Sequence, residues 1–196
     1  VSKGCDALPF YRMEKQFERL GIPVARSTMV RLFHTSIERN LRPIADRILQ
    51  LIRQSEVVLA DETPMGMQKK PDTGKAGKGY VWTFIGENLV GYRFSATRSG
   101  ETPRNLLGGT SGTLVVDAYT GYNKTCSPES RVRAGCLAHV RRKFFDAKSS
   151  TPEAQTALEL ILQLYLVEHD AKERGITRTP AHLALRIERS VPIMAR

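Results

Sequence analysis

The chain has 196 residues, of which 41% are hydrophobic, and this is enough for one sizeable buried core. Its formal charge of +10 favours a polyanionic partner such as nucleic acid, although a merely soluble basic protein would show the same excess. No apolar run approaches the ~18 residues of a membrane span and no signal peptide is recognisable, so we expect a cytoplasmic protein without membrane contact. The three cysteines show no CxxC spacing, which argues against a disulfide framework or a complete zinc finger.

Residues 10 to 54 show helical spacing of their apolar side chains. Gly21 ends the first helix, Ser27 or Thr28 can cap a second, and Pro43 interrupts it before another helical stretch. This order resembles a helix-turn-helix whose Thr28, Arg31 and His34 would contact DNA bases. A plain helical hairpin without DNA contacts is the alternative, since many helix pairs have a glycine turn.

Two aspartates follow short β-branched runs further along the chain. Val57-Val58-Leu59-Ala60 precedes Asp61, and Leu114-Val115-Val116 precedes Asp117. Apolar runs of this length are typical of strands buried on both faces, so each carboxylate should emerge where its strand leaves the core. Taken singly, either aspartate could equally cap a turn.

The elements around these aspartates alternate between strands and helices. We expect a loop over residues 66 to 79, whose Lys75 and Lys78 could lie against DNA. The expected strands and helices are, in order, strand 57–61, strands 80–85 and 89–95, helix 99–107, strand 114–117, strand 131–136, and helices 137–147, 151–175 and 180–190. This is the order of the ribonuclease-H-like fold, an α/β mixed sheet flanked by helices, in which the first and fourth strands are neighbours.

Neighbouring strands would bring Asp61 and Asp117 to a shared metal site. Phosphodiester cleavage by two Mg²⁺ (or Mn²⁺) ions ~3.5 to 4 Å apart needs hard carboxylate ligands of this kind. The pair therefore indicates half of a metal-dependent phosphoryl-transfer site.

Several segments in the same order resemble one bacterial family. They are DETP at Asp61, GYVWTFIG at Gly79, SGETP, LVVDAYTGY around Asp117 and AGCLAHVRRKFFDA from Ala134. Together with LPFYRMEKQFERLGIPVARSTMVRL, they are similar to the transposases of insertion sequence family 66. The resemblance implies a DDE transposase with a ribonuclease-H-like core, in which Asp61 and Asp117 are the first two metal-binding acids.

The resemblance extends to residues after the second aspartate. Cys136 and His139 resemble the C-x-x-H element of several DDE groups, although a helix-start histidine bonded locally would look the same. Arg141, Arg142 and Lys143 would grip DNA phosphates, with a solvated basic face as the alternative.

The third acid of the family lies in an asparagine-rich segment that does not appear before Arg196. We therefore expect a truncated or incomplete copy. Glu168 is the best internal candidate because it falls on the apolar stripe of its helix, where a local arginine partner would explain it as well.

Three segments follow from these observations: a helix-turn-helix-like segment over 1–54, a partial ribonuclease-H-like core over 55–148, and a helical insertion or C-terminal segment over 149–196. The expected function is DNA cleavage and strand transfer at insertion-sequence ends, with weak or no activity in this chain. Its partners would be double-stranded end and target DNA, with a homodimer or accessory proteins possible. The alternative is a catalytically inert DNA-binding fragment or regulator derived from a transposase.

Overall fold

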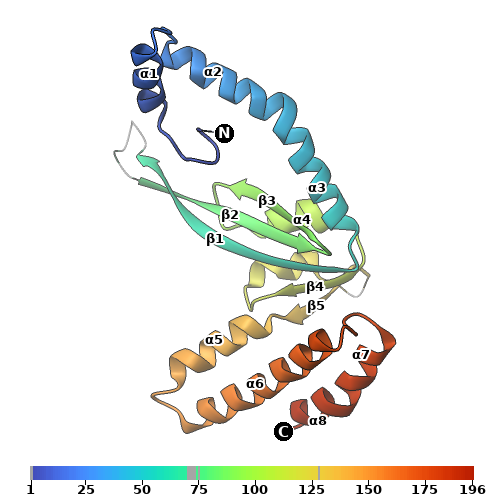
Figure 1. Cartoon of the computed structure of the whole chain (residues 1–196). Helices are drawn as coiled ribbons and strands as arrows, with labels where there is room; N and C mark the ends of the chain where they lie inside the picture. The colour runs from blue at the N-terminus through green and yellow to red at the C-terminus, as the bar shows by residue number, and fades with distance from the viewer. Residues whose placement is uncertain (1, 70–73, 75, 128) are drawn as a thin grey trace. The chain divides into compact units, whose positions relative to one another are not determined.

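The mixed α/β class predicted from the sequence is confirmed. A computed structural model describes residues 2–69, 74, 76–127 and 129–196, and shows a five-stranded sheet with helical segments at both ends of the chain (Figure 1). The chain divides into two compact units, each described by itself. The first comprises Val1–Leu114 and Gly121–Val132, and the second comprises Val115–Thr120 and Arg133–Arg196.

The sheet has the strand order β3-β2-β1-β4-β5. Strands β1, β2 and β3 form an antiparallel meander, with Asp61 opposite Thr83 and Thr83 opposite Tyr92. The adjacency of the first and fourth strands predicted from the element order is thus confirmed. The strands are β1 Val57–Lys69, β2 Ala76–Gly86, β3 Leu89–Ser95, β4 Gly112–Val116 and β5 Arg131–Gly135.

Strand β1 differs from its prediction in two respects. It continues to Lys69, so Asp61 lies within the strand. Of the expected loop over 66–79, residues 66–69 and 76–79 are strand, and residues 70–73 and 75 lie outside the described residues. Only one face of β1 is buried, because Val58 is inaccessible whereas Leu59 is 41% exposed. The physical reason is the antiparallel pairing with β2, which supplies backbone hydrogen bonds to the segment and leaves one face of the meander to solvent.

The buried face of the meander packs against helix α3 (Arg42–Gln54). Leu49 and Ile52 of α3 are buried there. A Cβ atom on Gly91 of β3 would lie 2.5 Å from Leu49 Cδ2, so this position requires glycine for the helix to approach the sheet so closely. Trp82 and Tyr122 complete the core with a T-shaped ring contact at 5.8 Å, Tyr122 coming from the short helix η2 (Thr120–Thr125).

The N-terminal helices form a hairpin. Helix α1 (Phe10–Arg19) contacts helix α2 (Arg26–Ser36) through an edge-to-face pair of Phe10 and Phe33. The expected cap at Ser27 or Thr28 is wrong, since α2 begins at Arg26. Glu14 of α1 takes over the capping role and accepts a hydrogen bond from the Arg26 backbone N–H at 2.9 Å.

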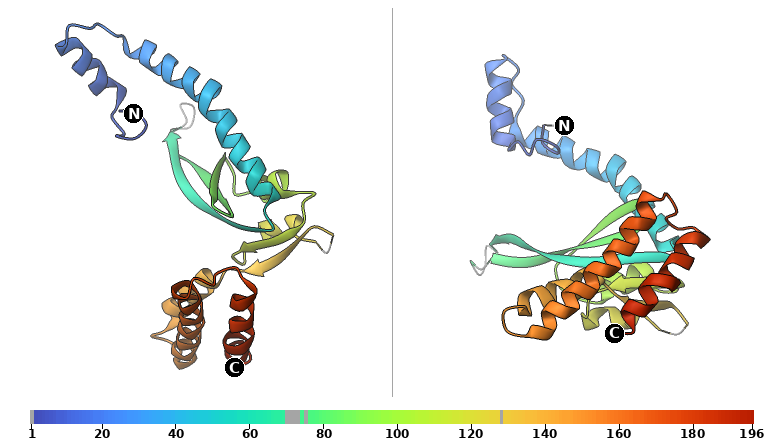
Figure 2. Two further views of the ribbon diagram at one scale, coloured as in Figure 1. Left: turned by 45° about the vertical axis from the view of Figure 1, so that its right-hand side comes forward. Right: turned by 60° about the horizontal axis from the view of Figure 1, so that its bottom comes forward.

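The sequence predicts that Pro43 interrupts the helix, and this prediction is wrong. A π-helical turn, η1 (Ile37–Leu41), joins α2 to α3, so the chain stays helical from Arg26 to Gln54 (Figures 1 and 2). Pro43 has no backbone N–H to donate within this continuous path, and the π turn that precedes it changes the hydrogen-bond spacing at that point. The widened turn before it relieves the clash of the proline ring with the preceding carbonyl groups.

Arg131 fastens the end of α3 to the sheet. Its side chain is 1% exposed and donates to the backbone oxygens of Arg53 at 2.8 Å and Ser55 at 3.0 Å, and to Thr110 Oγ1 at 2.8 Å. Burial lowers the pKa of the Arg131 guanidinium. Its charge is balanced by oxygen dipoles at the C-terminal end of a helix, where cations are stabilised.

The second unit is mainly helical. Helix α4 (Glu101–Leu107) still belongs to the first unit, whereas α5 (Leu137–Ala147), α6 (Pro152–Glu173), α7 (Pro180–Leu185), η3 (Arg186–Ser190) and α8 (Val191–Met194) follow in the second. Val167, Ala171 and Leu185 form its buried cluster. The predicted bounds of α5 are confirmed, and α6 ends close to the predicted Gly175, which has a positive φ of 65°. In the described part of the chain, no helix combines the length and apolarity needed to cross a membrane.

Candidate functional site

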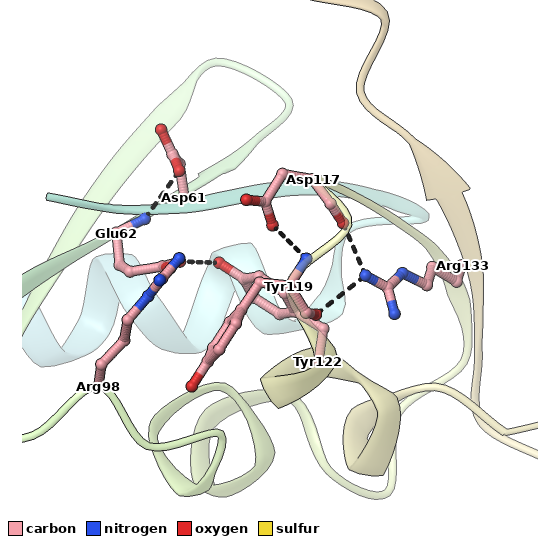
Figure 3. A network of polar contacts seen from close by, with 7 residues as sticks. All are labelled: Asp61, Glu62, Arg98, Asp117, Tyr119, Tyr122 and Arg133. Carbon is pink, nitrogen blue, oxygen red and sulfur yellow. Dashed lines mark hydrogen bonds and ion pairs between the residues drawn. The ribbon is translucent and has the colours of Figure 1, made fainter. Parts of the chain in front are cut away.

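Asp61 and its neighbour Glu62 leave β1 on opposite faces of the sheet (Figure 3). Asp61 is exposed, and its Oδ1 accepts the Glu62 backbone N–H at 3.0 Å. The alternation follows from the period of two along a strand. A carboxylate on the open face of the meander can therefore meet solvent, a metal ion or DNA.

Glu62 is the centre of a buried polar network that the sequence reasoning missed. Its side chain is 1% exposed and pairs with Arg98 at 2.5 Å, while Tyr122 donates its hydroxyl to Glu62 Oε2 at 2.7 Å (Figure 3). Both partners are distant in sequence, and only the alternation around Asp61 could have placed Glu62 on the inner face. The network fixes β1 against η2, and η2 follows directly after the segment that carries Asp117.

Asp117 directly follows β4, as predicted, and lies in a tightly bonded turn of the second unit. Its Oδ1 accepts the Tyr119 backbone N–H at 2.9 Å. Arg133 of β5 donates Nη2 to the Asp117 backbone oxygen at 2.6 Å and to the Tyr119 oxygen at 2.9 Å (Figure 3). These bonds hold the backbone of the aspartate in one conformation. Arg133 is a further residue that sequence reasoning missed, because nothing local distinguishes it from Arg131.

An open pocket of about 600 Å³ lies beside Asp117. The backbone N–H of Cys136 donates to Val116 O at 2.8 Å and so joins the start of α5 to the end of β4. This junction brings the Cys136 and His139 pair to the same pocket as the aspartate. The lining residues are Val116, Asp117, Ala118, Arg133, Gly135, Cys136, His139, Val140 and Lys143.

The basic triplet of α5 is divided between two sides of the helix. Lys143 lines the Asp117 pocket, whereas Arg141 and Arg142 line a second open groove of about 540 Å³ between α5 and α6. Successive residues of a helix point about 100° apart, so three adjacent cations cannot share one face. The three predicted phosphate contacts therefore lie on two surfaces of α5.

Glu168 has a local arginine partner, which the sequence left open as the alternative to a role as the third acid. Arg186 of η3 donates Nε to Oε1 at 2.7 Å and Nη2 to Oε2 at 2.5 Å, and His182 Nε2 lies 3.2 Å from Oε2. The hydrogen bonds from Arg186 are the main cause that lowers the pKa of Glu168, and Glu168 in turn raises the pKa of Arg186. The carboxylate links α6 to α7 and η3.

The remaining predicted DNA contacts lie in the first unit. Arg31 and His34 are exposed on α2, and Thr28 is half-buried. Lys78 is exposed on β2, with Nζ 5.9 Å from the centroid of the Tyr80 ring, and Lys75 lies outside the described residues. The accessible side chains suit contacts with a polyanion.

The donor set fits a divalent cation only in part. Asp61 and Asp117 supply the carboxylate oxygens that Mg²⁺ and Mn²⁺ prefer. Among the residues that the structure describes, no group of three or more His, Cys, Asp or Glu side chains is arranged to hold a metal ion. Two acids would therefore be the contribution of this chain to a metal centre.

The fold and the site define an α/β protein in which β1 carries Asp61 and its neighbour in the sheet, β4, is followed directly by Asp117. The sequence matches the family described as "Transposase IS66 family" over residues 1–196. The chain belongs to this family of transposases.

Three relatives come from Sinorhizobium fredii (strain NBRC 101917 / NGR234), and each is named as an uncharacterized protein. Protein y4qI is 33% identical over 100% of this chain and 39% of its own length, and y4jD is 32% identical over 99% and 40%. Protein y4hP is 26% identical over 94% of this chain and 37% of its own length. The chain thus spans about two fifths of the curated relatives that it matches.

Proposed function

We propose that this chain is part of a DDE transposase and contributes Asp61 and Asp117 to metal-dependent cleavage and strand transfer at insertion-sequence ends. One observation carries the proposal: Asp61 belongs to β1 and Asp117 directly follows β4, and these strands are neighbours in the sheet. Membership of the IS66 family supports the same chemistry. The strand order also fits the ribonuclease-H-like core that this chemistry requires.

In this proposal, the chain's own residues bind and orient DNA and metal. Asp61 and Asp117 would hold Mg²⁺ or Mn²⁺, which supplies activation of the attacking oxygen and stabilisation of the leaving oxygen. Arg133 keeps the Asp117 backbone in place through its two carbonyl contacts. Lys143 is positioned in the same pocket to neutralise a phosphate of the reacting strand.

DNA ends would be selected by a different part of the chain. The exposed Arg31 and His34, together with Thr28, would read bases, while phosphate contacts by Arg141, Arg142 and Lys143 would add affinity without sequence preference. A homodimer or accessory proteins would assemble the two ends of the element.

Metal binding tests the proposal directly. We expect Mn²⁺ bound to the 196-residue chain, followed by electron paramagnetic resonance, to be lost in both Asp61→Asn and Asp117→Asn. Asp146→Asn, which removes an exposed aspartate of α5, is the matched control and should bind as the parent does. Unchanged Mn²⁺ binding in Asp117→Asn would overturn the assignment.

A second candidate function is that of a catalytically inert DNA-binding fragment. The pairing of Glu168 with Arg186 favours it, because this engaged carboxylate is the best internal candidate for the third acid. Incubation with Mn²⁺ and end-containing duplex separates the two. Robust cleavage that disappears in Glu168→Gln would show that the third acid lies within these residues, whereas DNA binding without cleavage would support the fragment.

A further inference from the structure

The groove between α5 and α6 is lined by basic and aromatic side chains that have no part in the proposed metal site. One face of α5 contributes Ala138, Arg141, Arg142 and Phe145, at spacings of three and four residues, and α6 contributes Leu162 and Tyr165. The two helices lie side by side in the second unit (Figure 1). No acidic side chain is among the six lining residues.

Two aromatic rings are accessible in this groove. Phe145 is 47% exposed and Tyr165 is 39% exposed, although a ring of this size usually finds partners in a core. Arg141 lies 6.0 Å from the centroid of the Phe145 ring, and Lys148 Nζ lies 3.7 Å from it. The groove therefore brings cationic and exposed aromatic side chains together in a space large enough for a small ligand.

The cations of the groove are uncompensated. Within the described residues, Arg141, Arg142 and Lys148 have no carboxylate at ion-pair distance, whereas eight other arginines do. A ligand that is both anionic and planar would satisfy the guanidinium groups and the rings at once. A nucleotide has this chemistry, and a base can enter only where it is unstacked from its neighbours.

We propose that the α5–α6 groove binds an unpaired nucleotide of single-stranded DNA, with its base on Phe145 and Tyr165 and its phosphate on Arg141 and Arg142. The inference rests on the proposed function, since it takes DNA as the ligand. Lys143 and Asp117 line the pocket on another side of the same helix, so a strand that reacts there can place a neighbouring base in the groove. Lys148 gives up its contact with the Phe145 ring to the base, because stacking of a base on an aromatic ring is stronger than an exposed cation–π contact.

Fluorescence anisotropy with three probes tests the groove. The probes are a labelled oligothymidylate, an abasic strand of equal length with the same phosphates, and a blunt duplex. Phe145→Leu keeps apolar volume and removes the π face, so we expect about tenfold weaker binding of oligothymidylate. Binding of the abasic strand and the duplex should not change. Tyr165→Leu should act in the same direction.

Phe144→Leu is the matched control, because Phe144 is a 37% exposed aromatic of the same helix that does not line the groove. It should bind all three probes as the parent chain does. Circular dichroism checks that each variant is folded, and the two aromatic variants test the groove independently of each other.

Equal weakening for oligothymidylate and the abasic strand would show a purely electrostatic surface, open to any acidic partner, and would overturn the inference. Unchanged oligothymidylate binding in both aromatic variants would overturn it too. Neither of these results would affect the Mn²⁺ test of the proposed function. If the Mn²⁺ test fails while the groove still shows base-dependent binding, only the proposed metal chemistry is refuted.

Discussion

At the scale of single residues, Glu62 and Asp61 show how a one-residue step along a strand separates two roles. The inward carboxylate is tied to Arg98 and Tyr122, while the outward one faces the open side of the meander. An acidic pair in a sequence therefore need not be a pair of ligands. The buried member fixes the backbone from which its neighbour projects.

Replacing Glu62 should cost stability because both of its oxygens are used. We expect Glu62→Gln to lower the free energy of unfolding by about 1–3 kcal/mol, since it weakens charge-assisted bonds while Arg98 stays partly in water. Urea denaturation measures the change. Glu56→Gln alters an exposed carboxylate one residue before β1 and should stay within about 0.5 kcal/mol of the parent. Equal effects of the two substitutions would contradict the structural role of Glu62.

At the scale of elements, the link between α6 and η3 depends on the ionised form of Glu168. Arg186 lowers the pKa of this carboxyl below its ordinary 4.5 in the folded chain. A lowered folded pKa means that the stabilisation is fully present above the unfolded value. It is lost as the pH falls through the folded value.

Glu168→Gln should therefore destabilise the second unit at neutral pH and make little difference in acid. We expect at most about 1 kcal/mol at pH 7, because Glu168 and Arg186 are both partly exposed and water screens their attraction. Urea denaturation at pH 7 and at about pH 3.5 measures the difference. The control Glu159→Gln changes an exposed carboxyl of α6 that contacts Gln155. A difference between Glu168→Gln and the parent that grows in acid would contradict the sign.

The elements also show where sequence patterns suffice. The bounds of α5 follow from its local spacing, β3 follows from its aromatic and apolar content, and β4 follows from a β-branched run that begins at glycine. Gly66 was the predicted start of a loop, yet it lies in β1, because pairing with β2 outweighs its local preference. Likewise, the sequence predicts that Pro43 interrupts the helix, whereas a π turn keeps the chain helical across this position.

The site is predictable to a smaller extent than the fold. The placement of Asp117 after β4 and the location of Cys136 and His139 at the start of α5 follow from local sequence. The partners Arg133, Arg98 and Tyr122 come from distant segments, and their contacts depend on sheet order. Lys143 lines a different pocket from Arg141 and Arg142. This separation depends on which side of α5 packs against α6, and the sequence alone does not give that packing.

At the scale of the whole chain, the charge of +10 predicts that the proposed DNA binding is sensitive to salt. Each neutralised phosphate contact steepens the logarithmic salt dependence of duplex binding by about 0.9. Lys143→Gln should reduce the slope by about this amount, whereas Lys172→Gln, an exposed cation of α6, should leave it unchanged. Anisotropy titrations of a duplex over a range of salt concentrations measure both slopes. Equal slopes for all three proteins would remove Lys143 from the interface.

The uninterrupted helical path from Arg26 to Gln54 can also transmit force along the first unit. At 1.5 Å per residue it is a rod of roughly 43 Å, clamped where Leu49 and Ile52 press on the sheet. A force on the α1–α2 hairpin acts at the end of a long lever, so a small rotation at the clamp becomes a large displacement at the tip. The π turn before Pro43 is the place where the hydrogen-bond spacing along this lever changes.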